Sequence, residues 1–410
     1  MDTIRTAVDT FRAAAFRAVT AGGRFRPRVL QHGLGAALTI ALVLLPPSGI
    51  GQSQWKRVGN SWVRVYSGSL PAAPRLRIAG HGPVTVTAGS GREISYTITV
   101  SVMTPSQTSA QMAVNRQPIR LETNGDWAVL TTPGGPALST VVIRVPKLAA
   151  LALATTNGAV EAKGVDGPNE VNTGAGELSC DRIRGNCSLI TGGGDIHVGE
   201  VDGALRCDTR GGHISVKNVG GIATLTTDGG DIEALQAGGA VNAQTRAGTV
   251  HIGSANGPVD AATGGGEIVV DKATGIVTAR NLAGPVQVGA AAGVHCESHS
   301  GGIRVSNIAG AMRVSTSAGS IFASMLNGRL ADSFLATGNG DITVMIPSNV
   351  GVNIRAVNAM TDNLRRIVSD YRQVQTRFRG AALVAEGAVN GGGPLLQING
   401  TGGTIFIKRQ

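Results

Sequence analysis

The sequence predicts an all-β fold, a single-stranded β-solenoid with 18-residue coils and β-rich caps at both ends. Three observations predict it, since glycines, threonines and aliphatic residues each recur every 18 residues. A repeat this short cannot bury its own apolar face, so successive repeats have to stack. The three columns are Gly167, Gly185, Gly203, Gly221, Gly239, Gly257, Gly275 and Gly293; Thr155, Thr173, Thr191, Thr209, Thr227, Thr245 and Thr263; and Val160, Leu178, Ile196, Ile214, Ile232, Val250, Ile268 and Val286.

Each coil is predicted to contain two short strands joined by glycine-rich corners. In one coil Ile196 and Val198 alternate with His197, which is the two-residue period of a strand. After a turn at Gly203, a second alternation runs through Cys207. The inward positions are small or β-branched and suit a narrow core. They are Ala162, Cys180, Val198, Val216, Ala234, Ile252, Val270 and Val288 on the first strand, and Val171, Leu189, Cys207, Leu225, Ala243, Ala261 and Ala279 on the second.

The threonine and glycine columns have structural explanations. Each threonine ends the second strand, where its hydroxyl can bond another hydroxyl or nearby backbone groups and so remain satisfied at the core edge. The glycines are expected at tight corners, where a Cβ would clash or φ is positive.

Two irregularities interrupt the period without ending it. One residue is missing between Gly284 and Val294, and Ile342 arrives three residues late. Counting through both predicts eleven coils, about 50 Å long at the spacing of stacked strands. The general crossover preference predicts a right-handed parallel β-helix.

Residues 1–51 are predicted to be an export signal or an N-terminal anchor. Leu34–Leu45 is an apolar run of 12 residues, too short for an ordinary membrane span, and small residues around Gly51 suit cleavage there. The chain has a net charge of +10, of which this segment holds +4. The remainder has no dense Lys/Arg stripe and few aromatic residues, so nucleic-acid binding is not expected.

The rest of the chain divides into three predicted parts. Residues 52–150 alternate like strands without the period and form a β-rich N-terminal cap. Residues 151–346 form the solenoid repeats, and residues 347–410 are C-terminal β-strands closing the solenoid. Within the last part, residues 359–380 are expected to form an irregular loop or a bent strand pair, and residues 404–407 a final rung.

The four cysteines, Cys180, Cys187, Cys207 and Cys296, all occupy inward positions. One interpretation is that they are small buried hydrophobic residues. The other applies to Cys180 and Cys187, which face each other across one corner, where a disulfide would form in an oxidising compartment. Cys187 and Cys296 lie about six coils apart and cannot pair.

Several segments carry a resemblance to a known family. They are "VIRVP" at 142–146, "LALATTNGAVEA" at 151–162, "GDITVMIP" at 340–347 and "NGGGPLLQINGTGGTIFIKR" at 390–409. Over roughly residues 60–410 the chain resembles a bacterial family of exported putative adhesins. Its domain of unknown function is related to the head domains of autotransporter adhesins. The resemblance implies a β-solenoid and an envelope or surface location, with no catalytic residues to carry over.

The outward columns do not predict catalytic chemistry. A β-helix enzyme acting on polysaccharide needs carboxylates converging on one face. His197 and His251 share a column but lie three coils apart, about 14 Å. An acid precedes the first strand in several coils, but His213 and Thr249 take this position in two of them. Acids two coils apart are separated by about 10 Å, which is too far for both to bind one calcium ion. These corner acids are Glu177, Asp195, Asp231, Glu267 and Asp341.

We therefore predict a non-enzymatic, adhesin-like binding or scaffold protein of the cell envelope or secreted space. It is expected in the periplasm, at the cell surface or outside the cell, with no cofactor-binding, metal or catalytic residues. Its partner is an unidentified envelope component, either a glycan or a protein, and it meets a membrane only through an uncleaved N-terminal segment. The alternatives are a β-helix polysaccharide-active enzyme and a self-assembling envelope scaffold.

Overall fold

The computed structural model describes residues 51–326, 330–359 and 366–410. The chain divides into two compact units, residues 1–46 and 47–410, and every described element belongs to the second. The predicted export segment lies outside the described residues except for Gly51. A search of the described residues for helices long and apolar enough to cross a membrane finds none.

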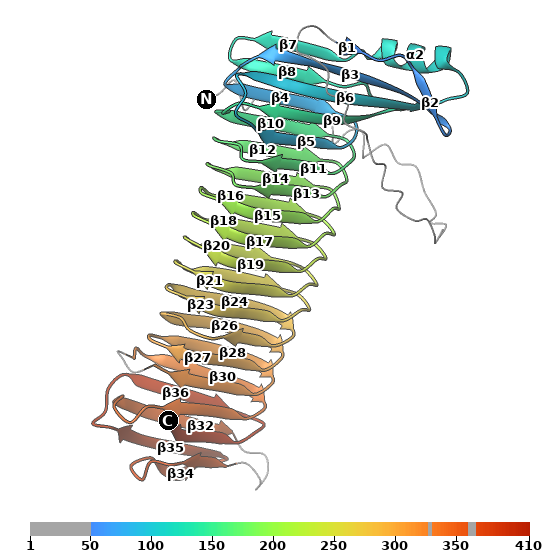
Figure 1. The fold of residues 1–410 in the computed structure, drawn as a ribbon. Coiled ribbons are helices and arrows are strands. Elements are labelled where there is room, and N and C mark those ends of the chain that lie inside the picture. The colour runs from blue at the N-terminus through green and yellow to red at the C-terminus, as the bar shows by residue number, and fades with distance from the viewer. Residues whose placement is uncertain (1–50, 327–329, 360–365) are drawn as a thin grey trace. The chain divides into compact units, whose positions relative to one another are not determined.

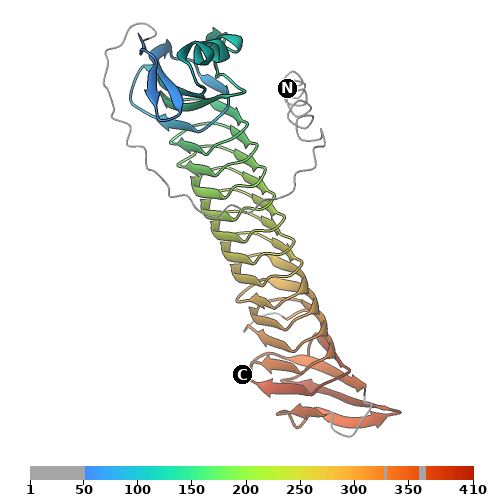
Figure 2. The ribbon, with the colours of Figure 1, turned by 90° about the vertical axis from the view of Figure 1, so that its right-hand side faces the viewer.

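The fold is a β-solenoid, as predicted, in which each coil adds one strand to each of two parallel sheets (Figure 1). Eleven coils run from β10 to β31, and the turned view in Figure 2 shows them stacked one upon another. Sheet A of this repeat contains β11 (Val160–Lys163), β13 (Leu178–Asp181), β15 (Ile196–Val201), β17 (Ile214–Val219), β19 (Ile232–Ala237), β21 (Val250–Ala255), β23 (Ile268–Ala273), β25 (Val286–Val288), β27 (Ile303–Ile308), β29 (Ile321–Met325) and β31 (Ile342–Ile346). Sheet B contains β10 (Ala150–Thr155), β12 (Asn169–Thr173), β14 (Cys187–Thr191), β16 (Leu205–Thr209), β18 (Ala223–Thr227), β20 (Val241–Gln244), β22 (Val259–Thr263), β24 (Ile276–Ala283), β26 (Gly293–Ser300), β28 (Met312–Ala318) and β30 (Ser333–Asn339).

The strand register follows the sequence period and absorbs both irregularities. Ile214 pairs with Ile232, one full repeat later. Val286 pairs with Ile303, which confirms the missing residue, and Ile321 pairs with Ile342, which confirms the insertion.

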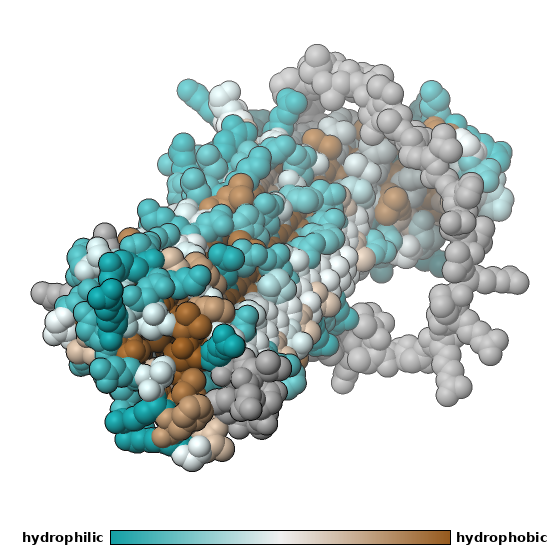
Figure 3. All heavy atoms as spheres, turned by 90° about the horizontal axis from the view of Figure 1, so that it is seen from below, coloured by the Kyte–Doolittle hydropathy of each residue, from teal (hydrophilic) through white to brown (hydrophobic). Residues whose placement is uncertain are grey.

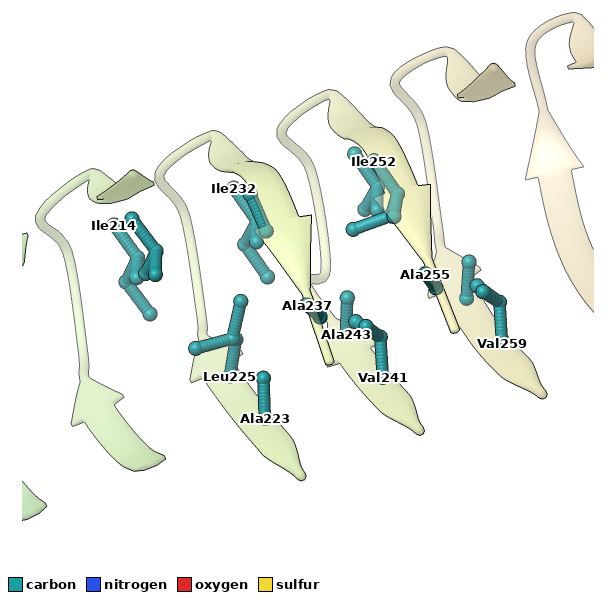
Figure 4. Packing of buried hydrophobic residues seen from close by; sticks show 14 of the residues in the cluster. Ile214, Ala223, Leu225, Ile232, Ala237, Val241, Ala243, Ile252, Ala255 and Val259 are labelled. Atoms are coloured by element: carbon teal, nitrogen blue, oxygen red, sulfur yellow. The ribbon is translucent and has the colours of Figure 1, made fainter. Parts of the chain in front are cut away.

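The core is a narrow layer of aliphatic side chains between the two sheets. Ile214, Ile232 and Leu225 point inward with at most 1% of their surface exposed (Figure 4). The predicted inward columns are confirmed. A third inward column, which the sequence analysis missed, follows a break in the alternation of buried and exposed residues, either within a sheet A strand or just after its end. Its members are Val165, Ile183, Val201, Val219, Ala237, Ala255, Ala273, Ala291, Ile308 and Met325.

The threonine column holds neighbouring coils together through the backbone. The hydroxyl of Thr227 donates to the carbonyl of Gly212 in the previous coil at 2.9 Å and accepts from the amide of Gly230 at 3.2 Å. A Cβ on Gly230 would lie 2.0 Å from the Gly212 carbonyl oxygen. Close approach of stacked backbones, rather than a positive φ, therefore requires glycine at this corner.

At the N-terminal end, two coils stack in an order that differs from chain order. β4 (Arg75–Gly80) and β5 (Val84–Ala88) pair in parallel with β10 and β11. β8 (Trp127–Thr131) and β9 (Ala137–Val145) pair in parallel with the other edges of β4 and β5. The first coil of the chain is therefore enclosed between a later coil and the repeat.

Antiparallel strands close this end. β6 (Glu93–Met103) lies against β9, and β3 (Ser61–Pro71) lies against β6. Antiparallel pairing interrupts the parallel ladder, so further coils cannot be added in the same way. The shorter strands are β1 (Gly51–Gln52) and β2 (Lys56–Val58), which pair with β3, and β7 (Arg120–Asn124), which pairs with β8.

A single helix, α2 (Gln107–Arg116), is found among the described residues. It begins after Ser106, whose hydroxyl accepts a hydrogen bond from the amide of Ser109 and so satisfies an amide of the first turn. Ala110 and Val114, four residues apart, lie on its buried face.

The C-terminal end repeats the arrangement of the N-terminal end. β36 (Leu395–Gly400) and β37 (Ile405–Arg409) pair with β30 and β31 on one side. On the other side they pair with β32 (Val352–Ala359) and β33 (Ile367–Ser369). The predicted final rung is a rung, but it is not the last one in space, because an earlier coil lies beyond it.

Two antiparallel strands extend sheet B past this coil. β35 (Ala382–Val389) pairs with β32, and β34 (Gln375–Arg379) pairs with β35 as the outermost strand. The stretch predicted as a loop or bent strand pair contains β33 and β34 with irregular chain between them, as far as it lies in the described residues.

Candidate functional site

Three of the corner acids, Asp195, Asp231 and Asp341, accept hydrogen bonds from backbone amides of a neighbouring coil. Asp195 accepts a hydrogen bond from the amide of His213 at 2.8 Å, and His213 Nδ1 accepts one from the amide of Asp231 at 3.0 Å. Asp231 accepts in turn from the amide of Thr249 at 2.7 Å. Each side chain satisfies an amide one coil away. Over residues 51–326, 330–359 and 366–410, no group of three or more His, Cys, Asp or Glu could hold a metal ion.

The outward histidines pair with carboxylates along the face of sheet A. His251 lies 3.2 Å from Asp271 and 4.0 Å from Glu233, measured between imidazole nitrogen and carboxylate oxygen, and His197 lies 3.6 Å from Glu177. All these side chains are at least one-third exposed, so the pairs contribute little free energy.

The hydroxyl groups lie differently around the two histidines. Ser179 and Ser215 are in register with His197 on the two strands beside it, but among the described residues no hydrogen bond joins either hydroxyl to that imidazole. His251 has no serine in register on either neighbouring strand. Ser215 is in register with Glu233, and Glu233 with His251, so Ser215 and His251 lie two strands apart. That spacing, about 10 Å, prevents His251 from taking the Ser215 proton directly.

The four cysteines are buried and have free thiols in the structure. A hydrogen bond with Cys187, together with burial, raises the pKa of Cys180, so these two side chains adjoin. Burial raises the pKa of Cys207, and it raises that of Cys296 to about 12. Thiols with raised pKa values and no exposure are poor nucleophiles. The disulfide between Cys180 and Cys187 stays a prediction.

A shallow trough on sheet B is the hollow that the sequence analysis did not anticipate. It crosses β26, β28, β30 and β36, encloses about 300 Å³, and has no charged side chain among its lining residues. The lining residues are Ser298, Ser315, Thr316, Ser317, Ala336, Thr337, Gly338, Asn399 and Thr401.

Side-chain size produces this trough. Arg280, Glu297, Ser315 and Ala336 occupy one outward column on successive strands, so two long side chains are followed by two short ones. Asn399 continues the column only because β36 is inserted beside β30. The sequence does contain a signal, which is two small residues in succession in one outward column. It can be recognised only after the three-residue insertion before Ile342 has been taken into account in the strand register.

Comparisons with known proteins identify no family for this chain, and the similar solved structures are distant. No family model matches the chain, and a search of curated proteins finds no match. Among solved structures, a putative cell adhesion protein from Clostridium sporogenes ATCC 15579 matches at 10% identity and a TM-score of 0.19, covering 85% of this chain and 100% of its own. A putative adhesin from Bacteroides fragilis NCTC 9343 matches at 14% identity and a TM-score of 0.25, covering 63% of this chain and 98% of its own. At these scores, function has to be inferred from the residues of this chain.

Proposed function

We propose that this chain is a non-enzymatic, adhesin-like binding protein that is exported to the cell envelope or beyond. The trough between Ser298 and Asn399 carries this proposal, because it is a hollow on a described outer face that brings together the Ser315 and Ser317 hydroxyls and the Asn399 amide. The hydroxyls of Ser298, Thr316 and Thr337 at its edge already donate to backbone carbonyls. Elsewhere, the residues that most resemble catalytic groups are engaged in bonds between coils or in surface ion pairs. Export rests on the apolar run Leu34–Leu45.

The ligand that suits this trough is a neutral glycan segment. Hydroxyl and amide groups both donate and accept hydrogen bonds, as sugar hydroxyls do, and an uncharged lining imposes no charge on the ligand. The open trough spans several coils, so a polymer can lie across it and make many weak contacts.

A binding screen of the full chain against glycans and envelope polymers, with product analysis, tests this function. Replacing Ser315 and Asn399 with Ala should weaken binding about fivefold for each hydrogen bond lost. The matched control is Thr224→Ala with Thr278→Ala, at outward positions of the same sheet away from the trough. Equal loss in both pairs would contradict a site at the trough, and cleavage of any polymer would identify an enzyme instead.

A further inference from the structure

Charge is segregated along the solenoid. Residues 151–302, called the shaft below, hold nine Lys and Arg against sixteen Asp and Glu, a net −7. Residues 303–410, called the tip, hold eleven against five, a net +6. Residues 52–150 hold ten against three, a net +7. An acidic middle therefore separates two basic ends.

Aromatic residues follow the same division. The sequence has no Phe, Tyr or Trp between Trp127 and Phe322. The tip then holds four phenylalanines, none of which belongs to the buried core. Phenylalanine is ordinarily among the most buried residue types, so one exposed ring and three half-buried rings at one end of a stack indicate a contact surface. They are Phe322, Phe334, Phe378 and Phe406.

On sheet A, two of these rings continue the outward column that along the shaft is polar except at Val269. Phe322, Thr343 and Phe406 are in register on β29, β31 and β37. The Arg304 guanidinium lies 4.5 Å from the Phe322 ring centre, and the Lys408 ammonium lies 5.5 Å from that of Phe406. Each ring therefore has a cation over its face.

The other two rings lie on sheet B and at the end of the stack. Phe334 is in register with Arg313 on the neighbouring strand. Phe378 stands between Arg377 and Arg379 on β34, the outermost strand, and is 71% exposed. Viewed from this end, an apolar strip is flanked by hydrophilic residues (Figure 3). The rings thus occur on both faces and the end, and do not form one flat platform of the kind that stacks on a sugar.

We propose that the tip docks end-on into the headgroup region of an anionic lipid surface. Phenylalanines on several sides contact one environment only if the tip enters it, and phenylalanine has no polar group for hydrogen-bonding a glycan. Arg372 and Arg379 form no ion pair with any described residue, so they are available to lipid phosphates. The acidic shaft is repelled by the same surface and stands away from it.

A second copy of the chain suits the tip less well. End-to-end association would bring the +6 tip against the +7 N-terminal end, or against another tip. Like charges at both ends oppose that contact. The trough lies within the tip, because all of its lining residues except Ser298 belong to residues 303–410. This inference rests on the phenylalanines and the positive charge, and does not depend on the proposed glycan site.

Flotation of the full chain with vesicles tests the proposal. Vesicles of phosphatidylcholine with phosphatidylglycerol should carry the protein upward, and phosphatidylcholine alone should carry much less. Replacing Arg372 and Arg379 with Gln should weaken binding about fivefold for each charge removed. The matched control is Arg210→Gln with Lys217→Gln on the shaft, which should not weaken it. Residues 1–51 are identical in all variants, so any vesicle binding that they contribute cancels when the variants are compared.

A fluorescent variant gives an independent measurement. Tryptophan emission of Phe378→Trp should shift to shorter wavelength with anionic vesicles and be quenched by brominated lipid, whereas Ile222→Trp, on the shaft, should not respond. Equal flotation of the tip and shaft variants, or a silent Trp at position 378, would overturn the proposal. So would sedimentation without vesicles, which would indicate self-association, or retention by an acidic polysaccharide alone. Ser315→Ala should float like the unmodified chain whether or not the glycan site is correct.

Discussion

The central coils and the ends of the stack follow different rules. In the centre each coil pairs with the coils before and after it in the chain, at a constant register. At the ends chain order and spatial order separate, because β4 and β5 lie inside β8 and β9, and β36 and β37 lie inside β32 and β33. The sequence period therefore specifies the growth of the solenoid, and departures from the period specify where growth stops.

The ends also solve a problem that the centre does not have. An uncovered coil exposes a row of backbone groups that can pair with another chain. Here antiparallel strands cover the last coils, and the outermost strand β34 carries Arg377 and Arg379. Positive charge on an edge strand opposes edge-to-edge pairing.

The largest expected difference between the two regions comes from a charge placed on β19 or on β33. Ile232→Asp buries an unpaired carboxylate in the centre and should cost more than about 4 kcal/mol, abolishing cooperative unfolding of the soluble protein. Val368→Asp, on an end strand where Val368 is 42% exposed, should melt close to the unmodified chain. Circular dichroism melting of both variants makes the comparison. A soluble Ile232→Asp variant with unchanged melting would contradict the inward assignment.

An intermediate effect is expected from adding one methyl group at a corner of the central stack. Gly230→Ala forces a Cβ to 2.0 Å from the Gly212 carbonyl oxygen and should cost about 2–3 kcal/mol. A Cβ on the neighbouring Gly229 would have no other group within 4 Å, so Gly229→Ala should change stability by less than about 0.5 kcal/mol. Urea denaturation measures the free energy of unfolding of both variants. Equal values would show that neighbouring coils can move apart at this corner without loss of stability.

Up to about pH 10, the smallest expected effect comes from the cysteines, which lie only in the central coils and so report on that region alone. Burial raises the pKa of Cys296 to about 12 from an ordinary value of 9.0. Above pH 9 the unfolded chain therefore loses protons that the folded chain keeps, and stability falls as pH rises from 9 towards 12. Melting temperature should decline over that interval, and less steeply in Cys296→Ala.

Thiol counting with the same protein tests the disulfide. At about pH 8 the folded chain should not react with a thiol reagent. After unfolding without reductant, two reactive thiols would support a bridge between Cys180 and Cys187, and four would contradict it.

The sequence was sufficient to predict the coil, two of its three inward columns and the eleven rungs, because those depend on contacts between positions 18 residues apart. It was not sufficient for the third inward column. Val198 and Val201 are both buried but lie three residues apart, which breaks the alternation that marks a strand. The spatial order of the coils at the two ends was missed for another reason. A coil such as Leu395–Arg409 has the same alternation of residues whether it stacks at the end of the solenoid or between two other coils.

The candidate surfaces were still less predictable. The trough requires Ser315 and Ala336 to be brought beside Asn399, a residue of an inserted strand. The tip requires Phe378, on the outermost strand of sheet B, to lie at the same end of the stack as Phe322 and Phe406 on sheet A. In both cases a pattern read along the chain does not show which strands become neighbours.

The inserted C-terminal coil has a consequence for the order of synthesis. β36 and β37 are synthesised after the coils on both sides of them, so they fill a space between two coils made earlier. That space stays unfilled until residue 409 has been made, so this end of the solenoid cannot close before then. A chain without residues 395–409 would expose strands on both sides of the gap, and closure of this end therefore depends on those fifteen residues.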